Sequence, residues 1–327
     1  MALPHINQLR RASIFFPIWT VDHTAELAQQ FWREEHQMDY DPTKAALFEP
    51  HLMPALSPVG VWSLDARCAE FSRLAYFRFE ASQRQQLKDA ISSHGFAGFD
   101  SFEDAATASQ GFAAVSADGV AIIAIRGTEK VAPASMLARL VQGLPFDLWT
   151  DAKIGMAGWA GSGKVHIGFR NAFDALIPKI DDWLNAHPHQ RLIVTGHSLG
   201  GAMATLVAGV LPDAELVTFG SPRVGNADFA ASLNAREVRR YVDCCDVVTK
   251  VPPPLIGYEH IAGGRYIDRA GTVLEAYPDA AWISDDQAKA IRDYWKKYAW
   301  RMGDNWFRSL SDHAPINYVS ALRGLRH

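Results

Sequence analysis

The sequence predicts an α/β fold, in which helices flank a mostly parallel central sheet and an N-terminal helical extension precedes it. Two observations support this fold class. From residue 169 onward, short apolar runs alternate with segments of helical spacing, an order typical of parallel sheets covered by helices on both faces. Upstream, two apolar runs flank Ala117-Asp118-Gly119, which is a hairpin signal.

The N-terminal half is expected to be helical until the first strands begin. Residues 21–40 place large apolar side chains among charges, which predicts an amphipathic helix within the extension. A second helical pattern covers about 64–92. The period of the apolar residues then changes, and the hairpin strands are expected at 111–116 and 120–125.

The C-terminal half supplies the alternating elements. Residues 169–184 carry apolar side chains along one helical face, and Pro188 ends that helix. The elements that follow are expected, in order, as a strand at 191–195, a small-residue helix at 199–211, a strand at 214–219, a helix at 227–233 and a strand at 238–242. Sheets of this kind carry their active sites at the carboxyl ends of the strands, so the residues after each strand are the candidates.

The composition is that of a globular protein with ample material for a core. Of 327 residues, 48% are hydrophobic and 21% are charged, which excludes a disordered chain. The net charge of −4 lacks the basic excess of nucleic-acid-binding proteins, so no nucleic-acid partner is expected. We expect residues 1–60 to form an N-terminal extension packed on the core, and residues 61–327 to form the domain that contains the sheet.

The cysteines and the lengths of the apolar runs bear on where in or outside the cell the protein acts. Cys68, Cys244 and Cys245 cannot build a disulfide framework and are interpreted as free thiols. No run of 18 apolar residues exists, so no transmembrane segment is expected. We recognise no signal peptide, which leaves a cytoplasmic location and leaderless export both open. The oligomeric state is not predicted.

A nucleophile motif follows the strand at 191–195. Gly196-His-Ser-Leu-Gly200 is a G-x-S-x-G pentapeptide that stands between an apolar strand and a small-residue helix. A serine on such a sharp strand-to-helix turn projects its hydroxyl from the sheet, and the glycines relieve the crowding of that turn. A glycine-rich turn without chemistry is the alternative explanation. The context favours Ser198 as a nucleophile.

An acyl-transfer serine also needs a base, an acid and oxyanion donors. Asp246 comes after the strand at 238–242, whereas its rival Asp243 directly continues that strand and is interpreted as part of it. The histidine should come last in the chain, which leaves His260 and His313 open, with spacing favouring His313. The backbone N–H of Leu199 and, from the loop after 120–125, the N–H and hydroxyl of Thr128 are the expected oxyanion donors.

At this point the residues resemble a known family, the class 3 lipases, over roughly 64–320. Five motifs in order carry the resemblance. They are Ile125-Arg-Gly-Thr128, Val165-His-Ile-Gly-Phe169, Gly196-His-Ser-Leu-Gly-Gly-Ala202, Phe219-Gly-Ser-Pro-Arg-Val-Gly-Asn226 and Asp246-Val-Val248. The resemblance implies an α/β-hydrolase fold and hydrolysis of carboxylic esters without a cofactor or metal.

The family's roles carry over onto matching positions of this chain. The resemblance implies that Ser198 is the nucleophile, Asp246 the acid and Thr128 the oxyanion residue. The family's histidine precedes a final helix, which points to His313, whereas His260 matches a non-catalytic Gly-Tyr-x-His element. Secreted fungal members carry disulfides, which this chain lacks, and residues 1–60 have no counterpart in the family.

A lid and an aromatic-rich region complete the sequence-based expectations. The apolar stripe after Thr128 predicts either a mobile lid that contacts substrate at a lipid–water interface or a docked surface helix. Its members are Met136, Leu137, Leu140, Val141 and Leu144. Residues 282–306 hold four tryptophans among charges. They predict a helix whose aromatic side chains serve either core packing or contact with lipid.

The expected function is hydrolysis of acylglycerols, with a lipid or small ester as the partner. Carboxylesterase, phospholipase A1 and feruloyl esterase activities fit the same catalytic residues, because fold and triad do not determine the substrate. An acyltransferase and a catalytically silent binding protein of the same fold are the alternatives of other classes.

Overall fold

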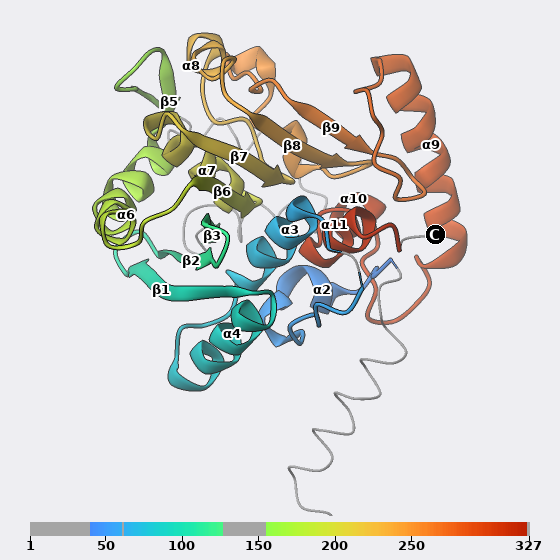
Figure 1. The fold of residues 1–327 in the computed structure, drawn as a ribbon. Helices are drawn as coiled ribbons and strands as arrows, with labels where there is room; N and C mark the ends of the chain where they lie inside the picture. The colour runs from blue at the N-terminus through green and yellow to red at the C-terminus, as the bar shows by residue number, and fades with distance from the viewer. Residues whose placement is uncertain (1–39, 61, 127–154, 326–327) are drawn as a thin grey trace, which may run out of the picture. The chain divides into compact units, whose positions relative to one another are not determined.

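The computed structural model describes residues 40–60, 62–126 and 155–325. These residues fall within one compact unit, Met38–His327. The centre of this unit is a seven-stranded sheet with the order β1-β2-β3-β6-β7-β8-β9, which runs across Figure 1 from β1 to β9. The expected α/β class is confirmed.

The first three strands form an antiparallel meander. They are β1 (Phe96–Asp104), β2 (Ser109–Ser116) and β3 (Val120–Arg126). Ala113 pairs with Ile123 across the β2–β3 hairpin, so the predicted hairpin is confirmed. Strand β1 was not anticipated, because only Phe96 and Phe102 of its nine residues are buried and the five residues between them show no regular apolar alternation.

The other four strands of the main sheet are parallel to β3 and to one another. They are β6 (Arg191–His197), β7 (Ala214–Phe219), β8 (Val238–Asp243) and β9 (Gly264–Ile267). Because they are parallel, their carboxyl ends meet at one edge of the sheet. A separate antiparallel pair consists of β4 (Met156–Gly158) and β5 (Lys164–His166).

Helices cover both faces of the sheet. On one face, α6 (Ile167–Ala186) and α7 (Leu199–Val210) share a core with alternate strand residues such as Ile123 and Val194. On the other face, α3 (Leu64–Leu74) packs against β6, where Ser72 Oγ and Thr195 Oγ1 lie 2.9 Å apart in a hydrogen bond. The C-terminal helix α11 (Pro315–Leu322) packs on α3 (Figure 1).

The predicted single helix over 64–92 is wrong, because α3 ends at Leu74 and α4 (Ala81–Ser93) begins afresh. The turn between them is closed by hydrogen bonds from Tyr76 N to Arg73 O and from Phe77 N to Leu74 O. Its residues tolerate a helix, so local propensity gives no sign of the break. The break is a tertiary effect: Phe77 is buried and Tyr76 reaches the nucleophile turn.

The remaining elements are shorter or lie at the rim. They are α2 (Lys44–Phe48), η1 (Pro50–Leu52), α8 (Ala227–Ser232), η3 (Val248–Lys250), η4 (Pro254–Ile256), α9 (Ala280–Lys297) and α10 (Arg308–Ser311). Helix α9 packs on β8 and β9 through Ala290 and Tyr266. Within the described ranges, no helix has the length and apolar character to cross a membrane.

The described part of the expected extension contacts the C-terminal helices. Asp41 N donates to Asn317 Oδ1 at 2.8 Å, and Asn305 Nδ2 donates to the carbonyls of Pro42 and Thr43. The rest of the predicted extension, including the helix expected at 21–40, lies outside the described residues except for Tyr40. The three cysteines are buried free thiols, as the sequence predicted.

Candidate active site

Ser198 stands on the sharp turn between β6 and α7. Its φ of +58° and ψ of −127° are a strained conformation for a non-glycine residue. A Cβ at Gly196 would lie 2.3 Å from the Gly200 carbonyl carbon, and one at Gly201 would lie 2.8 Å from Ser221 Cβ. Only glycine therefore lets strand and helix approach this closely, which is the local reason for the motif around Ser198.

Asp246 follows β8 on a tight turn. Its backbone N–H donates to Asp243 O at 2.8 Å, and its Oδ1 accepts the Val248 N–H at 2.8 Å. The side chain is fully buried. The Val248 N–H occupies Oδ1, which leaves Oδ2 available to accept a hydrogen bond from another side chain.

His313 joins these two residues into a hydrogen-bonded chain. It lies between α10 and α11, where its Nδ1 is 2.8 Å from Asp246 Oδ2 and its Nε2 is 2.9 Å from Ser198 Oγ. Because a carboxylate can only accept, Nδ1 carries the proton and Nε2 is free to accept from the serine hydroxyl. The structure thus brings together the three residues proposed from the sequence as nucleophile, base and acid.

Gly220, at the end of β7, makes room for this chain. Its φ is +59°, and a Cβ there would lie 2.6 Å from Asp246 Oδ2 and 3.0 Å from His313 Nδ1. Any side chain at this position would displace the acid or the base. The glycine of the Phe219-Gly220 motif is therefore explained by the site rather than by the turn alone.

Tyr318 is a member of the site that sequence reasoning missed. Its hydroxyl donates to Asp246 Oδ2 at 2.6 Å and accepts the Asp243 N–H at 3.1 Å. Burial, reinforced by the charge of Asp246, raises the pKa of Tyr318 well above its ordinary value, so the phenol remains a donor. No sequence signal marks it, because only folding brings α11 to the end of β8.

His197 holds the backbone of the base, His313, by a hydrogen bond, and sequence reasoning also missed it as a functional residue. Its Nε2 donates to the His313 carbonyl at 2.8 Å, and its Nδ1 lies 2.9 Å from the Tyr76 hydroxyl. Burial lowers the pKa of His197 well below its ordinary value, and His313 acts in the same direction. The ring is therefore neutral, with Nε2 as donor and Nδ1 as acceptor.

The rival histidine lies in a different environment. His260 Nε2 donates to Thr249 O at 2.7 Å, and burial lowers the pKa of His260 well below its ordinary value. Thr249 Oγ1 in turn donates to Asp246 O at 2.8 Å. His260 thus supports the loop that carries the acid, and it is His313 that hydrogen-bonds to Ser198.

The proposed oxyanion donors are described only in part. Leu199 is the first residue of α7, where backbone N–H groups have no partner within the helix. Thr128 lies outside the described residues, two positions after β3 ends at Arg126. The predicted lid residues also lie outside them; these are Met136, Leu137, Leu140, Val141 and Leu144.

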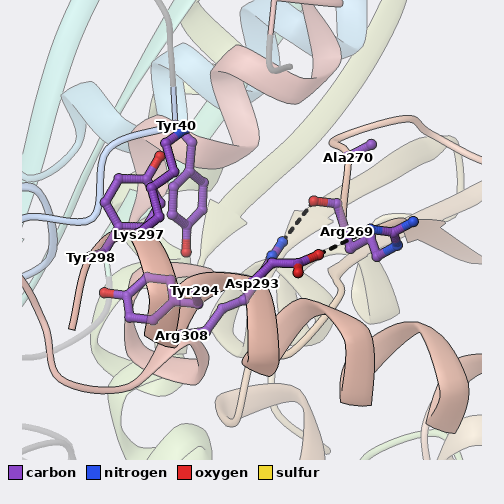
Figure 2. Close-up of a pocket in the computed structure, with 8 residues that line it drawn as sticks. All are labelled: Tyr40, Arg269, Ala270, Asp293, Tyr294, Lys297, Tyr298 and Arg308. Carbon is purple, nitrogen blue, oxygen red and sulfur yellow. Dashed lines mark hydrogen bonds and ion pairs between the residues drawn. The ribbon is translucent and has the colours of Figure 1, made fainter.

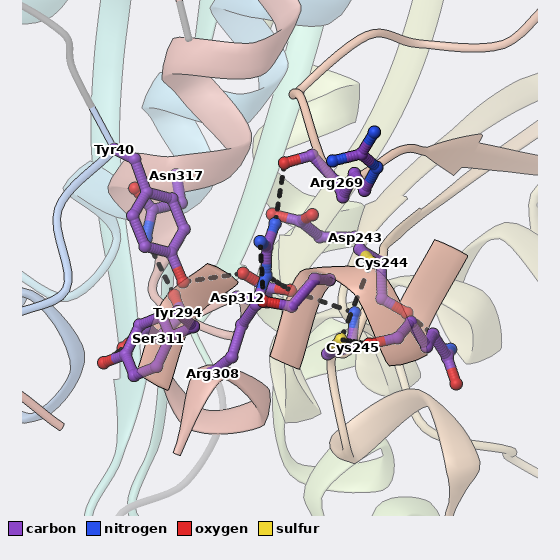
Figure 3. Close-up of polar contacts among 12 residues, drawn as sticks. Tyr40, Asp243, Cys244, Cys245, Arg269, Tyr294, Arg308, Ser311, Asp312 and Asn317 are labelled. Carbon is purple, nitrogen blue, oxygen red and sulfur yellow. Dashed lines mark hydrogen bonds and ion pairs between the residues drawn. The ribbon is translucent and has the colours of Figure 1, made fainter. Parts of the chain in front are cut away.

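One cluster among the described residues has donors of the kind that bind metals: Cys244, Cys245 and Asp312. It does not suit a metal ion. Both Asp312 oxygens already accept hydrogen bonds, including one from the Arg308 guanidinium. The hydrogen bond with Cys245, together with burial, raises the pKa of the Cys244 thiol, whereas a metal requires the thiolate. The cluster is a hydrogen-bonding group (Figure 3).

A small cavity of about 160 Å³ is lined by Arg308, the ion-pair partner of Asp312 (Figure 2), and Ser198 is not among its lining residues. Its lining combines tyrosines with charged side chains, and consists of Tyr40, Arg269, Ala270, Asp293, Tyr294, Lys297, Tyr298 and Arg308. Arg269 pairs with Asp293 at 3.2 Å, and Arg308 Nη2 donates to the Arg269 carbonyl at 2.9 Å. Two of the charged groups at its wall, Arg269 and Asp293, are thus paired with each other.

Comparison with known proteins finds similarity to lipases over part of the chain. The family model described as Lipase (class 3) matches residues 122–256, a range that includes Ser198 and Asp246 and ends before His313. A lipase of Rhizopus niveus is 38% identical over 112 residues, covering 30% of this chain and 29% of the relative. Secreted mono- and diacylglycerol lipase 1 of Fusarium solani is 37% identical over 119 residues, covering 33% and 35%.

A solved structure resembles the fold over two thirds of the chain. The mono- and diacylglycerol lipase from Aspergillus oryzae aligns with a TM-score of 0.50 and 24% identity, covering 66% of this chain and 80% of that one. This likeness concerns the fold alone. The sequence matches are shorter, and the chain spans about a third of the length of the curated relatives cited here.

Proposed function

We propose that this chain, whose residues 122–256 match the class 3 lipase family model, hydrolyses carboxylic esters, specifically those of acylglycerols, through an acyl-enzyme on Ser198. The observation that carries the proposal is the chain of hydrogen bonds from Ser198 Oγ through His313 to Asp246. Relatives named as lipases and as mono- and diacylglycerol lipases support the substrate class.

The first half of the reaction acylates the serine. His313 Nε2 takes the proton of Ser198 Oγ as the oxygen attacks the ester carbonyl. Asp246 holds the imidazole in the tautomer with a proton on Nδ1 and stabilises the imidazolium without accepting the proton. Tyr318 and the Val248 N–H keep the carboxylate in place.

Collapse of the tetrahedral intermediate completes the acylation, and hydrolysis of the acyl-enzyme then returns the free enzyme. The N–H groups of Leu199 and Thr128 stabilise the negative charge of the tetrahedral oxygen. Collapse of this intermediate breaks the ester C–O bond, and His313 gives its proton to the departing alcohol. Water activated by the same histidine then attacks the acyl-enzyme, releasing the carboxylic acid and Ser198.

Contact with a lipid surface is proposed on a second observation. The four tryptophans of 282–306 are exposed rather than packed in the core, at 44%, 46%, 77% and 63% for Trp282, Trp295, Trp300 and Trp306. The alternative of core packing is therefore wrong for them. Aromatic side chains interspersed with lysine and arginine are typical of segments that lie in a lipid interface. This favours a lipase over an esterase for soluble substrates.

The decisive test is hydrolysis of p-nitrophenyl esters with acyl chains from two to sixteen carbons, and of emulsified acylglycerol, by wild type and Ser198→Ala. We expect turnover to fall by about 10⁴-fold or more in the variant. A preference for long chains and emulsified substrate would support a lipase. Short-chain preference would identify a carboxylesterase, and no turnover by the folded wild type would favour a silent binding protein.

A further inference from the structure

We propose that Asp312 is a positioning residue that holds His313 against Asp246, by tying the histidine loop to the acid loop and to the segment at Tyr40. This inference rests on the proposed function, because it assigns a role relative to His313. Asp312 directly precedes His313, and its side chain is fully buried. It does not contact the reacting atoms in this arrangement; it acts through the backbone that carries the histidine.

Three donors from separate parts of the chain converge on this carboxylate (Figure 3). The Cys245 N–H donates to Asp312 Oδ2 at 2.9 Å, and Arg308 Nε donates to the same oxygen at 3.1 Å. The Tyr40 hydroxyl donates to Oδ1 at 2.8 Å. One side chain thus connects the loop after β8, the helix α10 and the N-terminal segment.

The connection to Cys245 is the step that bears on catalysis. Cys245 precedes Asp246 as Asp312 precedes His313, so two consecutive residues of one loop pair with two consecutive residues of the other. The bond between Asp312 and Cys245 is thus a second link parallel to the bond between His313 and Asp246. Two links fix both the separation and the rotation of the loops, whereas a single link leaves rotation free.

The carboxylate suits this position better than an amide. A carboxylate accepts on both oxygens, whereas an asparagine side chain offers one acceptor oxygen and an NH₂ group that only donates. In Asp312→Asn, the NH₂ group must therefore face either the Tyr40 hydroxyl or the two N–H donors of Cys245 and Arg308. The buried Arg308 guanidinium would also lose its ion-pair partner.

The test compares kcat and KM of wild type and Asp312→Asn with a p-nitrophenyl ester. We expect kcat to fall by about 10- to 100-fold with KM within about two-fold, because a small misplacement of the base slows the chemical step without changing substrate contacts. Tyr40→Phe keeps the ring and removes one of the bonds, so a loss of about three- to ten-fold in kcat is expected. If Asp312→Asn does not fold, the kcat of Tyr40→Phe tests whether these hydrogen bonds position His313.

Asp286→Asn is the matched control. Asp286 is also a buried carboxylate near these loops, but its Oδ2 accepts from Cys244 Sγ, the Tyr266 hydroxyl and the Arg269 N–H. We expect a lower Tm with kcat unchanged. A merely structural role for Asp312 predicts the same pattern for Asp312→Asn, and that result, or equal losses of kcat in both variants, would overturn the proposal.

A fluorophosphonate probe separates this inference from the proposed function. The probe reacts with a serine activated by its base, whatever the natural ester is, so its rate reports on the Ser198–His313 pair. We expect Asp312→Asn to react about 10-fold more slowly or worse. Equal rates would overturn the positioning role alone, whereas a wild type that reacts with neither probe nor ester would overturn the proposed function together with it.

Discussion

At the scale of single residues, two buried aspartates three positions apart compete for the role of catalytic acid. Asp246 Oδ2 accepts hydrogen bonds from both the imidazole of His313 and the phenol of Tyr318. The same phenol accepts the backbone N–H of Asp243, so Tyr318 holds the strand end and the acid in one geometry. The Asp243 residue contributes to this arrangement through its backbone, which a side-chain substitution leaves in place.

The two aspartates are therefore expected to respond differently to the same substitution. Asp246→Asn should lower kcat by about 10⁴-fold, because an amide facing Nδ1 favours the wrong imidazole tautomer. Asp243→Asn should retain kcat within about ten-fold, with the loss of a buried carboxylate appearing mainly in the Tm. Steady-state kinetics and thermal unfolding of both variants measure this. Full activity in Asp246→Asn with loss in Asp243→Asn would identify Asp243 as the acid.

At the scale of elements, α3 is the helix that links the N-terminal segment to the sheet. Its Glu70 and Arg73 are both fully buried and lie 2.6 Å apart. Glu70 Oε1 also accepts the Leu56 N–H, and Arg73 Nη2 also donates to Pro54 O. The pair thus fastens residues 50–56 to α3, whose other face packs on the strand that leads to Ser198.

Breaking this pair should cost stability and spare chemistry. Glu70→Gln leaves a buried guanidinium without a counter-charge, so the free energy of unfolding should fall by about 3–5 kcal/mol. The kcat of the remaining folded protein should be unchanged. Urea denaturation measures the first quantity and kinetics in the absence of urea the second.

An exposed pair provides the control for this experiment. Lys289 and Asp285 pair on α9 with side chains 47% and 64% exposed, so Lys289→Ala should change the free energy of unfolding by about 1 kcal/mol or less. Equal changes in the free energy of unfolding at the two sites would show that burial does not make the Glu70–Arg73 pair more stabilising than an exposed pair.

At the scale of the whole molecule, the segment from Trp295 to Phe307 combines exposed apolar side chains with positive charge. We call it the tryptophan surface; it consists of Trp295, Trp300, Met302, Trp306 and Phe307, all at least 41% exposed. The rings of Trp295 and Trp300 lie 6.0 Å apart edge to face, and Lys44 Nζ lies 5.6 Å from the Trp306 ring. Lys296, Lys297 and Arg301 follow Trp295 and Trp300 in the sequence, which suits an anionic lipid surface.

Vesicle binding tests this surface without turnover. In the Ser198→Ala background, we expect binding to vesicles of zwitterionic and anionic phospholipid that weakens with salt. The double substitution Trp300→Ala with Met302→Ser should weaken it by about ten-fold or more, because two apolar side chains no longer enter the interface. Co-sedimentation across lipid concentrations measures the affinity.

The control for vesicle binding is Leu255→Ser, which alters a side chain that is 95% exposed on η4. It should leave the affinity unchanged. If both variants bind as the parent does, the tryptophan surface does not contact lipid.

Features that depend on neighbours along the chain can be predicted from the residues alone. The hairpin at Ala117-Asp118-Gly119, the helix ended by Pro188 and the serine turn around Ser198 are set by local conformational preferences and by the period of apolar residues. The structure confirms these elements with boundaries shifted by a few residues. The α/β class followed from their alternation alone.

Tertiary structure decided what depends on residues far apart in sequence. From the residues alone, His260 and His313 both fitted, and only folding places one of them 2.9 Å from Ser198 Oγ. No local sequence pattern marks Tyr318 or Tyr40. The hydrogen-bond partners of their hydroxyls come from distant parts of the chain, and folding brings them together when α11 and the segment at Tyr40 reach the loop after β8. The break after α3 has the same origin. Hydrogen bonds and close packing act over a few ångströms in space, so spacing along the chain cannot reveal them.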